Sequence, residues 1–276
     1  MFNRTRFEQE MNSLRQYDVP PPGSSAATYY MPIDLNAALK GKRVGVYVPA
    51  AAAKAKIVDL IVYFHGVIGV CGDEGEYIRR GVEYLWSTAP FDKMRSELNA
   101  SGRAALLIAP RLDSRIGNVV TTAVMGDLNL DKKFDALVTK VIDRLKDDEH
   151  AVSKDVQLGN IILAAHSGGG FPMYAILKAK NDLRPKIRAC WGFECLYPGH
   201  KNWLDWLKEN SKFRFRHVRQ ECFKWDSAQA LRKGAGDRFV DSLIHKEEHA
   251  HCNLIQNYWK VMIQRMPMSA GADVAY

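Results

Sequence analysis

Residues 161–170 read Ile-Ile-Leu-Ala-Ala-His-Ser-Gly-Gly-Gly, and this stretch decides the fold. The apolar run at 161–165 has the length and composition of a buried strand. The glycines end that strand, and the segment 171–178 after them, Phe-Pro-Met-Tyr-Ala-Ile-Leu-Lys, is typical of a helix. The pattern therefore predicts a strand, a sharp turn with Ser167 at its apex, and a helix.

The turn has the residues that an activated serine requires. Ala165-His166-Ser167-Gly168-Gly169 is close to the G-x-S-x-G of a nucleophile elbow, in which the residues two before and two after the serine nearly touch. Ala165 adds one methyl group and Gly169 has no side chain. The N–H of Gly168, at a helix N-terminus, can stabilise an oxyanion. The alternative is a glycine-rich loop that binds phosphate or nothing, but a P-loop lysine and a full G-x-G-x-x-G are both lacking.

On these residues the chain resembles the α/β-hydrolase superfamily. The resemblance covers residues 28–265 and implies a mostly parallel central sheet with helices on both faces, a three-layer sandwich. The segment 59–67 supports it, because an apolar strand there ends in His65-Gly66-Val67. Family members carry the second oxyanion N–H on the loop after this strand, and by resemblance we assign it to Val67.

The order of predicted elements agrees with such a sheet. Single strands alternate with helices, which indicates parallel strands and a ligand site beyond their carboxyl ends. The first two strands are expected to form an antiparallel pair. Strands are expected at 28–33, 43–49, 59–64, 104–110, 156–165, 187–193, 213–218 and 239–244, and helices at 74–98, 131–147, 171–178, 201–211, 227–234 and 253–265.

The base that would activate Ser167 is expected near the C-terminus, since the resemblance implies the order serine, acid, histidine. His251 is our choice, on the loop before the final helix. His249 and His245 are close rivals on the same loop. His166 is too close in sequence to the serine to reach the far side of its hydroxyl.

The acid that would orient the base has three candidates. Glu194 follows the strand after the elbow and resembles both an Asp-x-Leu-Tyr segment of some bacterial hydrolases and the acid position of pancreatic lipase. Most superfamily members take the acid from the next strand, after which Glu221 and Asp226 stand. We favour Glu194, because Gly192 and its apolar neighbours suggest a buried strand end.

Two other functions remain open. Residues 245–249 match H-x-x-E-H, a zinc-hydrolase pattern built on His245, Glu248 and His249, but few residues remain downstream to supply a distant carboxylate ligand. A non-catalytic hydrolase-fold binding module is the second.

The preferred function is a serine hydrolase that uses no metal and no cofactor and cleaves an ester or amide bond of a small-molecule or peptide/acyl substrate. The sequence does not indicate which substrate, nor the oligomeric state.

Composition limits the remaining classes. The 276 residues are 47% hydrophobic, which suits one hydrolase domain at 28–265 between a polar, proline-rich lead (1–27) and a flexible tail (266–276). The net charge is +8, but no nucleic-acid motif is present, so no nucleic-acid partner is expected. The densest basic run, 208–219, alternates with apolar residues like a strand with a charged outer face. Five cysteines without a C-x-x-C pair, no apolar leader and no membrane span predict a cytoplasmic protein.

Overall fold

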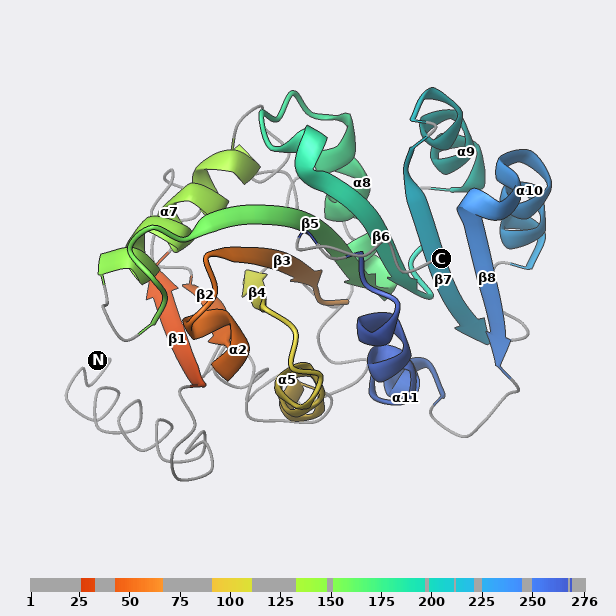
Figure 1. Ribbon diagram of the computed structural model, residues 1–276. Coiled ribbons are helices and arrows are strands. Elements are labelled where there is room, and N and C mark those ends of the chain that lie inside the picture. Colours follow the sequence, from red (N-terminus) through yellow and green to blue (C-terminus); the bar gives the residue numbers. More distant parts are fainter. Residues whose placement is uncertain are drawn as a thin grey trace, which may run out of the picture.

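The computed structural model describes residues 26–32, 43–66, 91–110, 133–147, 151–196, 199–210, 212–220, 225–244, 250–267 and 269. These residues form an eight-stranded sheet with helices on both faces (Figure 1). The strand order is β1-β2-β4-β3-β5-β6-β7-β8. The strands are β1 (Ala27–Pro32), β2 (Arg43–Val48), β3 (Ile57–Phe64), β4 (Ala105–Pro110), β5 (Gln157–His166), β6 (Ile187–Phe193), β7 (Arg214–Gln220) and β8 (Phe239–Ile244).

The pairing confirms a mostly parallel sheet. β1 runs antiparallel to β2, as predicted, and β2 antiparallel to β4. The pairs from β4 through β3, β5, β6 and β7 to β8 are all parallel. β3, β4 and the second half of β5 are buried along nearly their whole length, as apolar strands covered on both faces must be.

Two hydrophobic cores, one on each face, hold the helices to the sheet. One core joins the sheet to α7, α8, α9 and α10, and the other joins it to α5 and α11 (Figure 1). α7 shows the sequence cause: its apolar residues recur every three or four positions and all six are buried. The helices are α2 (Ala50–Ala53), α5 (Phe91–Ala100), α7 (Lys133–Asp147), α8 (Gly170–Lys178), α9 (His200–Glu209), α10 (Trp225–Ala235) and α11 (Ala250–Gln264). No helix of the described ranges is long and apolar enough to cross a membrane.

Two details differ from the sequence predictions. β7 is an interior strand, so Arg216 and Arg219 are buried and the strand has no charged outer face. α11 starts at Ala250, so His251 lies in its first turn and not on the preceding loop. The predicted helix at 253–265 began too late because it was placed by the apolar residues from Leu254 onward. Alanine, histidine and cysteine at 250–252 allow a helix without adding to its apolar face.

The chain after α11 is held against the sheet at residues that we had placed in the flexible tail. Met266 is fully buried. The N–H and hydroxyl of Ser269 both donate hydrogen bonds to the carboxylate of Asp59, which also accepts the N–H of Asn160 at 2.7 Å. Burial raises the pKa of Asp59, against these hydrogen bonds.

Candidate active site

Three strand ends meet at one edge of the sheet. Phe64 of β3 pairs with Ala165 of β5, and His166 of β5 pairs with Phe193 of β6. The residues that follow these ends therefore lie at the same level, with Ser167 between the β3 and β6 ends. This is the carboxyl edge, where ligands bind in sheets of this kind.

Ser167 occupies the turn predicted from the sequence. β5 ends at His166, a 3-10 turn covers Ser167–Gly169, and α8 begins at Gly170, which confirms the strand, turn and helix. Ser167 has φ of 49° and Glu194 has the same value; among the described residues no other non-glycine residue has positive φ. Such backbone costs about 1–3 kcal/mol and concentrates at functional sites.

The glycines of the turn are required by close packing. A Cβ atom on Gly169 would collide with the carbonyl oxygen of Phe64, and one on Gly66 would lie 2.8 Å from the Cβ of Ser167. The chain after β3 is therefore packed directly on the elbow. His65 is buried, and its Nδ1 donates a 2.7 Å hydrogen bond to the carbonyl oxygen of Gly66, which restrains that contact. Val67, the expected second oxyanion donor, lies outside the described residues.

The turn after β6 brings Glu194 to the same edge. Glu194 is 1% exposed, and its N–H donates to the carbonyl oxygen of Val218 at 2.9 Å, which extends the β6–β7 ladder beyond the strand. A Cβ atom on Gly170 would collide with the carbonyl oxygen of Cys195, so this turn packs on the start of α8. The elbow is thus in contact with the chain after β3 on one side and the chain after β6 on the other.

The rival acids are placed differently. Asp226 is exposed in the first turn of α10, and Glu221 lies outside the described residues. Of the two described candidates, only Glu194 is in a buried turn beside the elbow. Its desolvated position suits a carboxylate that must orient an imidazole.

The start of α11 is directed to the same edge. Its far end lies at the opposite edge, because Arg103, just before β4, donates to the carbonyl oxygens of Gln264 and Met266. Trp259 anchors the middle of the helix: its Nε1 donates to the carbonyl oxygen of Met94, and its ring meets Trp191 and Phe193. His251 precedes Trp259 by about 12 Å of helix, toward the edge that holds Ser167. His245 and His249 lie outside the described residues.

A buried ionic network on β7 and β8 was missed by the sequence analysis. Nδ1 of His217 lies 3.0 Å from Asp241, and Nε of Arg219 donates to the same carboxylate at 2.8 Å. Burial lowers the pKa of His217, so the ring is neutral and Nδ1–H donates. Burial raises the pKa of Asp241, but His217 and Arg219 outweigh it and leave that pKa below its usual value. The alternation of 215, 217 and 219 on one strand face was the available signal.

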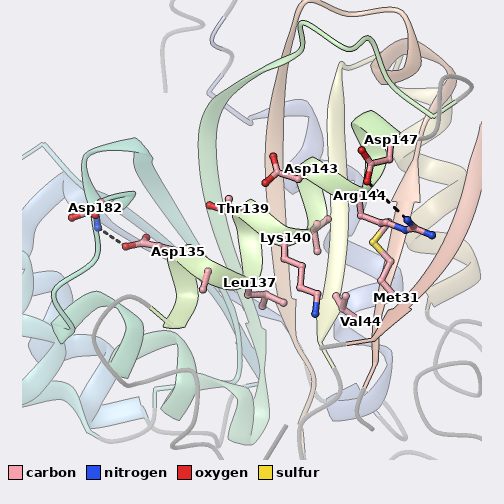
Figure 2. Close-up of a pocket in the computed structure, with 12 residues that line it drawn as sticks. Met31, Val44, Asp135, Leu137, Thr139, Lys140, Asp143, Arg144, Asp147 and Asp182 are labelled. Carbon is pink, nitrogen blue, oxygen red and sulfur yellow. Dashed lines mark hydrogen bonds and ion pairs between the residues drawn. The ribbon is translucent and has the colours of Figure 1, made fainter. Parts of the chain in front are cut away.

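A cavity of the described chain lies away from this edge. Figure 2 shows it beside α7, with Met31, Val44 and Leu137 in its wall. Its volume is about 780 Å³. Asp135 in its lining accepts the N–H groups of Asp182 and Leu183. Neither Ser167 nor Glu194 lines it. No group of three histidine, cysteine or carboxylate side chains in the described ranges could hold a metal, and the H-x-x-E-H segment lies outside them.

The strand order, the pairing directions and a serine on the turn after β5 define the α/β-hydrolase fold. Esterase Est22 is similar in structure over 96% of this chain and 88% of its own, with a TM-score of 0.51 and 10% identity. An acylaminoacyl peptidase of Pyrococcus horikoshii is similar over 95% of this chain but 44% of its own, with a TM-score of 0.50 and 11% identity. An S-formylglutathione hydrolase of Agrobacterium tumefaciens reaches 16% identity over 88% of this chain and 94% of its own, with a TM-score of 0.46. No protein-family model and no curated protein sequence matches the chain.

Proposed function

We propose that this protein is a serine hydrolase that cleaves an ester or amide bond through an acyl-enzyme. The observation that carries the proposal is the strained turn of Ser167, pressed between the chain after β3 and the turn of Glu194. Esterase Est22 and the acylaminoacyl peptidase share this fold, and their names describe the cleavage of acyl bonds of these two kinds. The substrate is then an acylated small molecule or peptide.

The proposed mechanism assigns one role to each group. His251 accepts the proton of the Ser167 hydroxyl as the oxygen attacks the substrate carbonyl. The N–H groups of Gly168 and Val67 bind the resulting oxyanion. His251 then protonates the leaving group, and a water molecule repeats the sequence to release the acid. Glu194 orients the imidazole and stabilises its charged form.

Other residues near the elbow are less suited to the chemistry. Cys195 is buried beside Gly170, and burial raises the pKa of its thiol, so it stays protonated and is a poor nucleophile. Cys190 is also a buried free thiol. Two buried free thiols fit a reducing compartment, and we propose a cytoplasmic location for the reaction.

A labelling experiment tests the nucleophile. A fluorophosphonate probe should label the wild-type chain and fail to label Ser167→Ala. Ser96→Ala is the matched control, because Ser96 is exposed on α5 and its hydroxyl donates to the carbonyl oxygen of Lys93 in the same helix. Labelling that persists in Ser167→Ala, or absence of both labelling and p-nitrophenyl ester hydrolysis in the wild type, would refute the proposal. Ester hydrolysis that disappears with EDTA would instead support the zinc alternative at 245–249.

A further inference from the structure

A second pocket lies at the opposite edge of the sheet from Ser167. It has a volume of about 470 Å³ and is formed where β6 and β7 begin, beside the ends of α8 and α9. The seven residues of β6 separate this amino edge from Glu194 by about 20 Å. The pocket is therefore separate from the proposed catalytic site, and its size is that of a small-molecule site.

The charges around the pocket are of one sign. Arg184, Arg188 and Lys212 line it, and none of its lining residues is a carboxylate. Within the described part of the chain, Arg188 and Lys212 have no hydrogen bond or ion pair. Three cations around one hollow, two of them unpaired, repel one another and favour an anion between them.

One of the cations is fixed in place. Nη2 of Arg184 donates to Oδ1 of Asn210 at 3.0 Å, and Nδ2 of Asn210 donates to the carbonyl oxygen of Trp206 at 2.6 Å. Asn210 also accepts the N–H of Phe213 through its carbonyl oxygen. A guanidinium held this way loses little freedom when it binds an anion, which strengthens recognition of phosphate.

The interior of the pocket offers two further features. Trp206 and Phe213 form a buried edge-to-face pair, with ring centroids 4.2 Å apart, that contributes an apolar wall. Asn181 is 8% exposed, and its Nδ2 donates to the carbonyl oxygen of Ile176, but its Oδ1 has no hydrogen-bond partner. A buried acceptor without a partner is costly, so a ligand hydroxyl or N–H that reaches it is favoured.

We propose that this pocket binds a phosphorylated small molecule with a hydroxyl donor and a flat apolar part, the chemistry of a nucleoside phosphate. The phosphate contacts Arg184, Arg188 and Lys212, the hydroxyl donates to Asn181, and the apolar part lies on the wall of Trp206. Nothing in this site depends on hydrolysis at Ser167. Binding therefore stands or falls separately from the proposed function.

The test titrates the full chain with ADP, pyrophosphate and adenosine at one low ionic strength, followed by tryptophan fluorescence and thermal unfolding. ADP should bind at least tenfold more tightly than either other probe. Arg184→Gln/Arg188→Gln should weaken ADP binding at least tenfold. The control Arg144→Gln/Lys146→Gln removes the same charge from α7 and should bind like wild type.

A single substitution at an exposed residue keeps the test informative if the double variant does not fold. Lys212→Glu places a carboxylate at the pocket mouth and should weaken ADP binding at least threefold while the chain keeps its unfolding temperature. Equal binding of ADP by wild type, the double variant and Lys212→Glu would overturn the proposal. It would also be overturned if adenosine or pyrophosphate bound as tightly as ADP, or if ADP did not bind at millimolar concentration.

Discussion

Gly66→Ala tests how closely the chain after β3 is packed on Ser167. The new Cβ would lie 2.8 Å from the Cβ of Ser167 and 3.2 Å from Nδ1 of His166. The first distance is about 0.6 Å shorter than an ordinary contact, so the serine or the chain after β3 must move by that amount. φ of Gly66 is outside the left-handed region, so alanine is allowed there and the effect is steric.

The size of the effect follows from that displacement. A misplacement of 1 Å at a reacting centre costs about a hundredfold in rate, so a shift of about 0.6 Å should lower kcat/KM by tenfold to a hundredfold. Overpacking costs about 1–3 kcal/mol in folding free energy, and Gly66 should fall at the low end because it is partly exposed. The assays are p-nitrophenyl ester hydrolysis, the rate of fluorophosphonate labelling, and urea unfolding.

Gly234→Ala is the matched control for this prediction. The three atoms nearest its Cβ would all belong to the side chain of Leu204, and Gly234 is an exposed residue of α10, away from the elbow. We expect unchanged kcat/KM, and a small stability change in which a helix-propensity gain of up to about 1 kcal/mol is offset by the displacement of Leu204. If Gly66→Ala kept kcat/KM within twofold of wild type, the reacting oxygen would not be the Ser167 hydroxyl described here.

Three more predictions concern buried polar groups. Glu194→Gln should lower kcat by about a thousandfold or more, whereas Asp226→Asn, on an exposed turn, should leave kcat within twofold of wild type. The reverse result would assign the role of the acid to Asp226. Since burial lowers the pKa of His217, the unfolded chain takes up a proton first as the pH falls. The contribution of His217 to the free energy of unfolding should therefore be fully present above about pH 6.5 and decrease below it. In urea unfolding, His217→Gln should make the free energy of unfolding depend less steeply on pH in that range. Ser269→Ala removes a donor to buried Asp59 and should lower the unfolding free energy by about 1–3 kcal/mol; an unchanged Tm would mean that the segment is not docked.

The parts of the fold that could be predicted from the sequence are those with a strong local cause. The run at 161–165 has the length and composition of a buried strand, and Gly168 and Gly169 favour a tight turn directly after it, so the strand, turn and helix of the elbow could be predicted. α7 was predictable because its apolar period is undisturbed. The sheet followed from the alternation of such elements, since parallel strands need helical crossovers.

The features that escaped prediction depend on pairing between distant segments. Arg219 sits in a basic run and so looked like part of an exposed face, but β8 pairs on its outer side and supplies Asp241. Ser269 looked like flexible tail because its partner, Asp59, is 210 positions away. A buried charge is stable only with its partner, and a single sequence does not show which distant residue will pair with it in the fold.

The buried network of His217, Arg219 and Asp241 gives a physical reason for the position of the proposed acid. Glu194 is held in a strained conformation, and strain persists only where the surroundings over-determine the backbone. One restraint is the hydrogen bond from its N–H to Val218. The residue after Val218 is Arg219, which is fixed to Asp241 inside the sheet. The strained turn is thus tied to a strand that cannot slide without breaking a buried ion pair, which costs about 3–5 kcal/mol. That cost exceeds the strain, so the backbone of Glu194 is held at this edge of the sheet, beside the turn of Ser167.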